Sequence, residues 1–288
     1  MGLQINQNIA AMNAYRNLSV TQGQMAKSLE KLSSGFRINR AADDAAGLSI
    51  SEGLRAQIGG LKVAVRNAQD GISVVQTAEG ALTETQAILQ RMRDLAVQAS
   101  NGGSQDAKAQ AAAQTEFGQL QSELDRIANT TAFGNQKVLN GSYSGTFQVG
   151  ANNTSAEQIA VNLTSTALTS VMGSGYTGLD SAGLQLGTSV AVSSTASAQA
   201  AITSVDNAIG AVSTVRATLG AYQNRFEHTI NNLNVAVENL SASESRIRDT
   251  DVAAEMVRFT RSQILSQAGT AMLAQANQAP QSVLQLLR

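Results

Sequence analysis

Two stretches of the chain place carboxylates beside guanidinium groups, a combination that could support acid–base or metal chemistry. The stretches are SSGFRINRAADDAAG (33–47) and SESRIRDTDVA (243–253). Together they contain four aspartates and four arginines: Asp43, Asp44, Asp249, Asp251, Arg37, Arg40, Arg246 and Arg248. Neither stretch has a histidine or a cysteine, so helix capping and ion pairing at two chain crossings is the better interpretation. We predict a hinge formed by Asp43, Asp44, Arg248 and Asp249.

The rest of the chain offers little more for catalysis. His228 is the single histidine and lies between Phe226 and Ile230, off the apolar row of its helix, so a surface position is expected. There is no cysteine, which excludes disulfides and thiolate metal ligands. We therefore predict no catalytic, cofactor-binding or metal site, and a protein that is not an enzyme.

Heptad spacing predicts the elements that must position these residues. From Leu54, apolar residues recur every three or four positions to Leu82, with one polar interruption at Glu79. Asp43 and Asp44 are candidate caps before this row, and NGGS (101–104) is a strong stop after it. An unbroken helix over 44–100 would be about 85 Å long. Such a rod needs partner helices along its length.

Two further rows supply those partners. One row, with Phe117 and Leu124 at its centre, predicts a helix that returns antiparallel to the first. The other runs from Ile202 to Leu240, with an interruption at Arg216. Several glycines fall within the first helix, where each costs up to about 1 kcal/mol against alanine. Close helix packing and slight axial sliding are both possible reasons for them, and the glycines are Gly53, Gly59, Gly60, Gly71 and Gly80.

Between these helices the composition changes to Gly, Ser, Thr and Asn. GTFQVGA and AEQIAVNL, joined by ANNTS, predict a β-hairpin, followed by a loose segment. The predicted fold is mainly α: a long antiparallel helical rod with a small β-hairpin region and a terminal two-helix coiled coil. We expect residues 1–43 and 250–288 to form the coiled coil, 44–141 and 198–249 the rod, and 142–197 the hairpin and variable region.

Both chain ends are neutral and helical, which is unusual because exposed ends ordinarily fray. No charged side chain precedes Arg16, and Arg288 is the one charge after Gln263. Two slender helices with so little bulk bury too little surface to offset their ordering entropy, so further copies of the chain should cover them. A head-to-tail contact that does not close forms a helical filament. The residues expected to act in assembly are Leu18, Met25, Leu29, Leu32, Met256, Phe259, Leu265, Met272, Leu284 and Leu287.

Bulk properties exclude other classes of partner. The net charge is −1, so no electrostatic attraction to nucleic acid or to an anionic membrane is expected. No run of about 18 apolar residues could span a bilayer, and no cleavable secretory signal is visible at the start.

Long segments at both ends resemble the bacterial flagellins. The matching segments are LSSGFRINRAADDAAGLSIS (32–51), NAQDGISVVQTAEGALTETQAILQRMRDLAVQ (67–98) and the closing LAQANQAPQSVLQLLR. The resemblance implies a self-assembling subunit of the extracellular flagellar filament, in a minimal form with little or no outer domain. It also implies export in an unfolded state through the flagellar type III channel, with an export chaperone, a filament cap and hook–filament junction proteins as partners. In the family, the terminal helices become ordered on assembly.

The stretch LQRMRDLAVQ resembles the segment that the flagellin-sensing Toll-like receptor of animal hosts binds. The residues carried over are Leu89, Gln90, Arg91, Leu95 and Glu116, with Asp94 where the family usually has Glu and Met92 where it has Val. Two alternatives stay open: a hook–filament junction protein of the same superfamily, and a secreted helical adhesin.

Overall fold

The computed structural model describes residues 8–103 and 105–286, with side chains to residue 278. Its helices are α1 (Ile9–Ser34), α2 (Ala45–Ser100), α3 (Ala107–Thr130), α4 (Ser165–Met172), α5 (Thr195–Arg248) and α6 (Val252–Leu286). The strands are β1 (Ala132–Phe133), β2 (Gln136–Lys137), β3 (Ser142–Gln148) and β4 (Gln158–Thr164), with a 3-10 turn, η1, at Ser155–Glu157. The predicted mainly α fold with a small antiparallel hairpin is confirmed.

Local chemistry explains where the helices begin and end. The Asn8 side chain caps α1 by accepting a hydrogen bond from the Ala11 amide, at 3.0 Å. After α1, Gly35 adopts the left-handed conformation at φ 76°, where glycine is favoured. The Asp106 side chain caps α3 in the same way as Asn8 caps α1. Helix α2 ends at Ser100, directly before the predicted NGGS stop, and its 56 residues span about 84 Å.

The chain forms two compact units, residues 1–58 with 238–288 and residues 59–237. Both boundaries fall within the long helices α2 and α5 and not in the segments that join helices. The three-part division expected from the sequence stays a prediction. Each unit is described by itself below.

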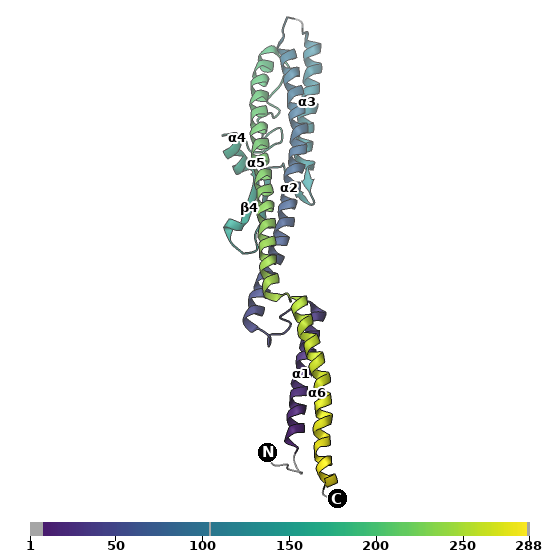
Figure 1. Ribbon diagram of the computed structural model, residues 1–288. Helices are drawn as coiled ribbons and strands as arrows, with labels where there is room; N and C mark the ends of the chain where they lie inside the picture. Colours follow the sequence, from purple (N-terminus) through teal and green to yellow (C-terminus); the bar gives the residue numbers. More distant parts are fainter. Residues whose placement is uncertain (1–7, 104, 287–288) are drawn as a thin grey trace. The chain divides into compact units, whose positions relative to one another are not determined.

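In the unit made of 59–237, three helical segments lie side by side: α2 from residue 59, α3, and α5 up to residue 237 (Figure 1). The core between them is a row of fully buried aliphatic and aromatic side chains, which includes Leu82, Leu89, Phe117 and Leu219. Alanines at several other core positions, such as Ala78 and Ala208, let the helices approach closely.

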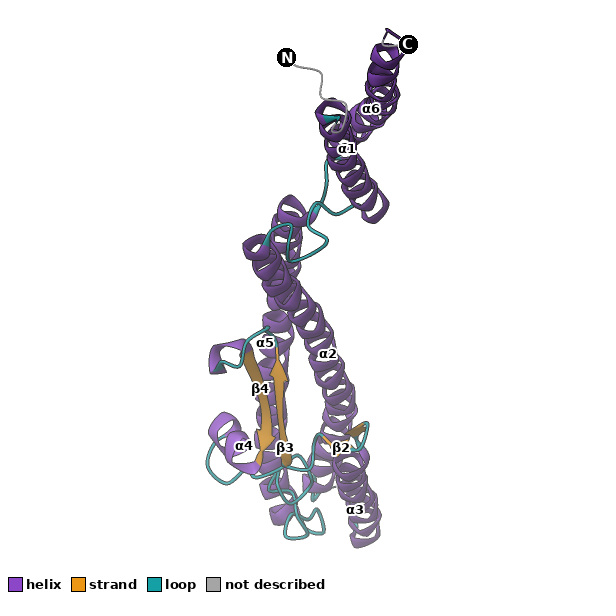
Figure 2. Cartoon of the chain, turned by 90° about the horizontal axis from the view of Figure 1, so that it is seen from below, coloured by secondary structure: helices purple, strands orange, loops and turns teal. Residues whose placement is uncertain are grey.

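The β3–β4 hairpin lies against this bundle, and its two strands are drawn together in Figure 2. Its register runs from Ser142 opposite Thr164 to Gln148 opposite Gln158. Along β4, alternate side chains are buried, as expected for a strand with one face on a core. The Phe147 ring meets the Phe226 ring of α5 edge-on, with centroids 5.5 Å apart.

The segment after the hairpin, expected to be loose, is packed down on α3. The Gln121 side chain donates to the Leu186 carbonyl at 2.7 Å, and the Asp125 carboxylate accepts from the Ser181 amide at 2.8 Å. These bonds satisfy backbone groups of a segment that has little regular structure of its own. Its fully or nearly fully buried side chains are Leu179, Leu184, Leu186 and Val192.

The unit made of 1–58 and 238–288 contains the antiparallel pair of α1 and α6, which lie side by side in Figure 1. The Asn8 side-chain amide donates to the Ala276 carbonyl at 2.6 Å, which ties the start of α1 to the later part of α6. The predicted two-helix pairing of the chain ends is thus present.

Candidate assembly surface on the terminal helices

Small and polar side chains form the seam between α1 and α6. On α1, the residues that are buried or half-buried at heptad spacing are Ala11, Ala14, Leu18, Thr21, Met25, Ser28 and Leu32. On α6 they are Glu255, Phe259, Ser262, Ser266, Gly269, Leu273 and Ala276. Seams of small residues let two helices approach closely but bury little apolar area.

Gly269 shows how closely these helices approach. A Cβ atom on Gly269 would lie 3.2 Å from Cδ1 of Leu18, which is one of the few bulky residues in the seam. Ser28 and Ser262 are almost fully buried in the same seam. The pair is therefore close but stabilised by little hydrophobic burial.

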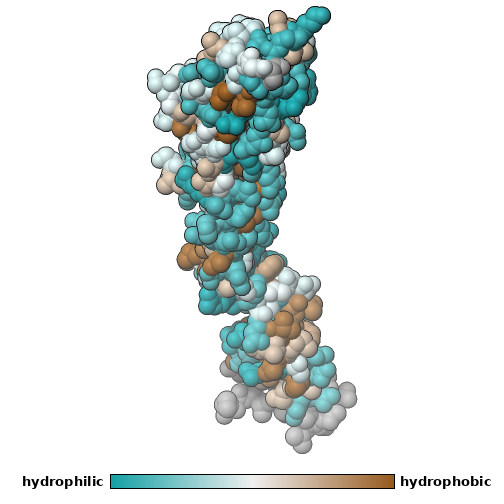
Figure 3. Space-filling view, turned by 90° about the horizontal axis from the view of Figure 1, so that it is seen from above, coloured by the Kyte–Doolittle hydropathy of each residue, from teal (hydrophilic) through white to brown (hydrophobic). Residues whose placement is uncertain are grey.

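Most of the bulky apolar residues of both helices are exposed instead. On α1 they are Ile9, Met12, Tyr15, Val20 and Leu29, and on α6 they are Val252, Met256, Val257, Ile264, Leu265 and Met272. Their exposed fractions run from 47% for Met256 to 67% for Met12. Figure 3 shows several hydrophobic patches on the part of the surface next to the grey chain ends. Contiguous exposed apolar surface of this kind marks an interaction site.

The structure separates the predicted assembly residues into two groups. Leu18, Met25, Leu32 and Phe259 lie in the α1–α6 seam, whereas Leu29, Met256, Leu265 and Met272 are exposed. Leu284 belongs to α6, but its side chain is outside the described residues, as is the whole of Leu287.

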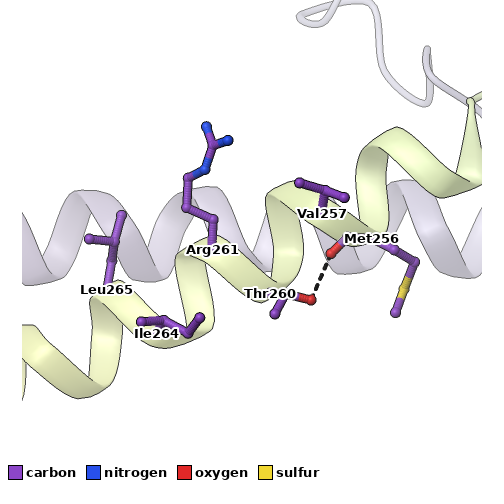
Figure 4. Close-up of a pocket in the computed structure, with 6 residues that line it drawn as sticks. All are labelled: Met256, Val257, Thr260, Arg261, Ile264 and Leu265. Carbon is purple, nitrogen blue, oxygen red and sulfur yellow. Dashed lines mark hydrogen bonds between the residues drawn. The ribbon is translucent and has the colours of Figure 1, made fainter.

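The exposed face of α6 is hollowed by a groove of about 530 Å³ (Figure 4). Its lining residues all come from α6: Met256, Val257, Thr260, Arg261, Ile264 and Leu265. The Thr260 hydroxyl donates to the Met256 carbonyl at 2.8 Å, so the one neutral polar group in the groove is satisfied within the helix. A second hollow, of about 720 Å³, involves Ile9, Met12 and Tyr15 of α1 together with Leu273 of α6.

The predicted hinge is a short pairing of two chain segments, one after α1 and one after α5. The Arg37 amide donates to the Arg248 carbonyl at 2.7 Å, and the Thr250 amide donates to the Gly35 carbonyl at 2.9 Å. These bonds resemble one step of an antiparallel ladder. The crossing is thus held by the backbone.

The Arg248 side chain lies at the centre of this crossing. Its guanidinium lies over the Phe36 ring, 4.9 Å from the ring centroid, and Nη1 is 2.6 Å from Oε1 of Glu52. Only 14% of the Arg248 side chain is exposed, so these contacts are stronger than those of a surface pair. Neither Phe36 nor Glu52 was expected to contact Arg248, because no sequence spacing relates residues that lie on separate elements.

The aspartates of the hinge act as caps. Oδ2 of Asp43 accepts hydrogen bonds from the Arg40 amide at 3.1 Å and the Asn39 amide at 3.3 Å. These amides, Arg40 above all, lower the pKa of Asp43. Asp44 accepts from the Gly47 amide at 2.8 Å, which caps the start of α2.

Two arginines of the hinge stretches, Arg40 and Arg248, take glutamates as ion-pair partners. Arg40 lies 2.9 Å from Glu30, and Asp249 accepts a hydrogen bond from the Ser245 hydroxyl at 2.6 Å.

Among residues 8–103 and 105–286, no group of three or more carboxylate, imidazole or thiol side chains could hold a metal ion. The lone histidine, His228, is exposed on α5. The groups that suggested acid–base chemistry are used for structure.

The segment that resembles a receptor-binding stretch lies on α2 beside α3. Leu89 and Leu95 are buried in the core, at 0% and 3% exposure, whereas Gln90 and Arg91 are exposed. Arg91 forms an ion pair with Glu116 of α3, with Nη2 and Oε1 2.6 Å apart. The part of this segment that another protein could touch is therefore Gln90, Arg91 and Glu116.

Comparison with known proteins gives consistent matches over the chain. Residues 5–144 match the bacterial flagellin N-terminal helical region, and residues 202–287 match the bacterial flagellin C-terminal helical region. The flagellin of Halalkalibacterium halodurans is 54% identical over 285 residues, which is 99% of each chain. The flagellin of Bacillus subtilis is 49% identical over 312 residues, covering 99% of this chain and all of that one.

A solved structure assigned to the flagellar hook-associated proteins, from Vibrio parahaemolyticus, has the same fold. It superimposes with a TM-score of 0.58, covering 72% of this chain and all of that one, at 12% sequence identity. At this identity the likeness concerns the fold alone.

Proposed function

The chain belongs to the bacterial flagellin family and is a structural subunit of the extracellular flagellar filament, and on this premise we propose how it assembles. The proposed contact is the exposed apolar surface of α1 and α6, covered head-to-tail by the terminal helices of neighbouring copies. The groove lined by Ile264 and Leu265 is the centre of this contact. The single observation that carries the proposal is that most of the bulky residues of both helices are exposed outside their shared seam.

Energetics support this arrangement. Burying an aliphatic side chain of this size contributes about 1.5–3 kcal/mol when it is fully exposed beforehand. Ile264 and Leu265 are 60% and 49% exposed, so each can contribute roughly 1–1.5 kcal/mol on assembly. The α6 surface from Gln263 onward has no charge before Arg288, so identical copies can approach without like-charge repulsion.

Replacing Ile264 and Leu265 by serine tests this contact. Each substitution should raise the critical concentration for seeded polymerisation about ten-fold, because about 1.4 kcal/mol corresponds to a factor of ten. Gln267→Ser, on the same helix and also exposed, is the matched control. Sedimentation of seeded reactions measures the free subunit concentration, and circular dichroism checks that the unassembled subunit keeps its helices. Normal polymerisation by the double variant would exclude this surface.

The family membership also favours a filament subunit over a hook–filament junction protein or an adhesin. The relatives named above are flagellins at about half identity over full length, whereas the hook-associated neighbour shares the fold at 12% identity. None of the helices in the described part of the chain has the length and hydropathy to span a bilayer. The measurement that separates the candidates is electron microscopy of the purified protein on seeds: micrometre filaments indicate the filament subunit.

Export and accessory partners extend the proposal. We propose that the chain is exported unfolded through the flagellar type III channel, and that an export chaperone covers the apolar face of α6 before assembly. The filament cap and the hook–filament junction proteins would meet the same surfaces at the two filament ends. Binding of the purified chaperone to the Ile264→Ser and Leu265→Ser double variant tests this: unchanged affinity would place the chaperone elsewhere.

A second candidate function is recognition of the unassembled subunit by the flagellin-sensing Toll-like receptor of animal hosts. The specific observation that favours it is the exposed Arg91–Glu116 pair with Gln90 beside it. Leu89 and Leu95 would then support the surface from below, because both are buried. Arg91→Ala should reduce receptor signalling, with Arg126→Ala, which removes an exposed ion pair elsewhere on α3, as the control. Equal signalling by the two variants would remove this function.

A further inference from the structure

Each of the two longest helices carries one ionisable residue within its apolar seam. On α2, Glu79 lies between Ala78 and Leu82, which are both fully buried. On α5, Arg216 lies between Val215 and Leu219, which are buried to the same degree. Polar residues at such positions cost stability, so their presence needs a reason.

The two interruptions meet in the structure. Nη1 of Arg216 donates to Oε1 of Gln86 at 2.5 Å, and Nη2 lies 3.5 Å from Oε1 of Glu79. Glu79 and Gln86 are seven residues apart on α2, so they share one helix face about 10.5 Å apart along the axis. The guanidinium therefore bridges two acceptors that lie two turns apart. The set of Arg216, Glu79 and Gln86 is called the polar layer below.

The polar layer is partly withdrawn from water. The Arg216 side chain is 31% exposed and the Glu79 side chain 38%. Within the described part of the chain, the buried Nε of Arg216 has no hydrogen-bond partner. An ion pair in this environment contributes little net stability, but separating its members is costly.

We propose that the polar layer selects the register in which α2 and α5 pair. Most of the remaining seam residues are aliphatic side chains at heptad spacing, so a slip of α5 by one heptad, or about 10.5 Å, would again place apolar residues opposite one another, although Phe226 would lose its place against Gly71. In a slipped pairing, Arg216 would lie against apolar seam residues with one acceptor or none. A single buried polar residue is known to select register in coiled coils for this reason. The inference does not depend on the proposed assembly surface.

The natural chain has no cysteine, so two introduced cysteines can carry spin labels without background. Val63 on α2 and Ser213 on α5 are both exposed, and by the pairing of the helices they lie about 35 Å apart along the bundle. In the unassembled full-length subunit, pulsed electron paramagnetic resonance should give one narrow distance distribution. With Glu79→Leu, Gln86→Leu and Arg216→Leu combined, the distribution should at least double in width or split by about 10 Å. The Tm of this variant should equal or exceed that of the labelled parent.

Two further variants separate register selection from a merely structural role. Arg93→Leu with Asp206→Leu removes another ion pair between α2 and α5, at 2.6 Å and nearly half exposed, and should leave the distribution narrow. Arg216→Lys keeps the positive charge but cannot bridge both acceptors. It should therefore broaden the distance distribution even though no polar residue of the layer has been replaced by an apolar one. A distribution as narrow as the parent's in the triple-leucine and lysine variants would overturn the proposal. So would equal broadening in the Arg93 and Asp206 variant.

Discussion

Gly71 and Gly80 lie on the same helix, α2, but the same substitution should affect them in opposite directions. A Cβ atom on Gly71 would lie 2.6 Å from Cζ and 2.9 Å from Cε1 of Phe226, whereas nothing lies within 4 Å of one on Gly80. The Phe226 ring is fully buried, and the Phe147 ring packs edge-on against it. It cannot withdraw without disturbing the contact between α5 and the hairpin.

The magnitudes follow from two opposing terms. Alanine stabilises a helix interior by about 1 kcal/mol over glycine, so Gly80→Ala should raise the free energy of unfolding by about that amount. At Gly71 the same gain is offset by overpacking against Phe226, which costs about 1–3 kcal/mol. The net effect of Gly71→Ala should be a loss of about 0–2 kcal/mol. At about 2–4 °C per kcal/mol for a domain of 150–250 residues, the two variants should differ in Tm by several degrees.

Thermal and urea unfolding of the unassembled subunit, followed by circular dichroism, measures both effects. The double variant of Gly71→Ala with Phe226→Leu is the control for the cause, because the shorter side chain leaves room for the new methyl group. In the Phe226→Leu background, Gly71→Ala should become neutral or stabilising. If Gly71→Ala stabilises the natural chain as much as Gly80→Ala does, the reasoning from close packing is wrong.

Three further outcomes are expected. The backbone amides that lower the pKa of Asp43 stabilise the fold at pH values above the ordinary carboxyl pKa, and this stabilisation is lost as pH falls through the lowered pKa of the folded state. The Tm difference between the natural chain and Asp43→Ala, measured in thermal scans at a series of pH values, should therefore shrink below about pH 4. Gly269→Val should weaken the α1–α6 pair, because its Cβ alone would lie 3.2 Å from Leu18, and an unchanged filament yield on seeds would contradict this. Arg91→Ala should change the free energy of unfolding by no more than about 1 kcal/mol in urea titrations, since the Arg91 and Glu116 side chains are 54% and 44% exposed.

Periodicity and capping predicted the long helices well because both signals are local. The α2 helix begins directly after Asp44 and ends directly before Asn101, where a cap and a stop were expected. The hairpin was predicted for the same reason, from two alternating runs around a turn. The five glycines singled out in α2 could not be sorted from the sequence: an added Cβ atom would meet Ala151 at Gly60 and Phe226 at Gly71, and would have nothing within 4 Å at the other three. The difference depends on which face of α2 each glycine occupies and on what lies opposite.

The segment between the hairpin and α5 shows a different limit. Its Ser, Thr and Gly content favoured a loose loop, but α3 holds it through side-chain hydrogen bonds from Gln121 and Asp125. On α3 alone these polar residues look like a solvent-facing row. Only the tertiary fold shows that they pair with backbone groups from residues more than fifty positions away.

The terminal helices show a third limit, in which the apolar pattern was recognised but only part of it lies between the two helices. Leu18, Met25 and Leu32 lie in the α1–α6 seam, yet Leu29 is exposed while Ser28 is buried. A heptad of small residues on α6, with Ser262, Ser266 and Gly269 in register, was the available signal for the true seam. A search for buried residues by hydrophobicity alone ranks such residues last, although two helices can approach closely only where their side chains are small.

This division of residues has a physical consequence for a subunit that must assemble. If the bulky side chains of α1 and α6 had been buried against one another, the pair would be stable alone and would offer neighbours a polar surface. With small and polar residues in the seam, including the nearly buried Glu255, the pair gains little from its internal contact. Most of the available hydrophobic free energy is then released only when other copies cover the outer faces. On the proposed contact we expect ordering of α1 and α6 to be coupled to polymerisation, and the coupling should weaken if Ser28 and Ser262 are both replaced by leucine, since that moves apolar burial into the seam of the unassembled subunit. A double-leucine variant with more helix as a free subunit and poorer polymer growth would show the coupling directly; unchanged helix content and growth would refute it.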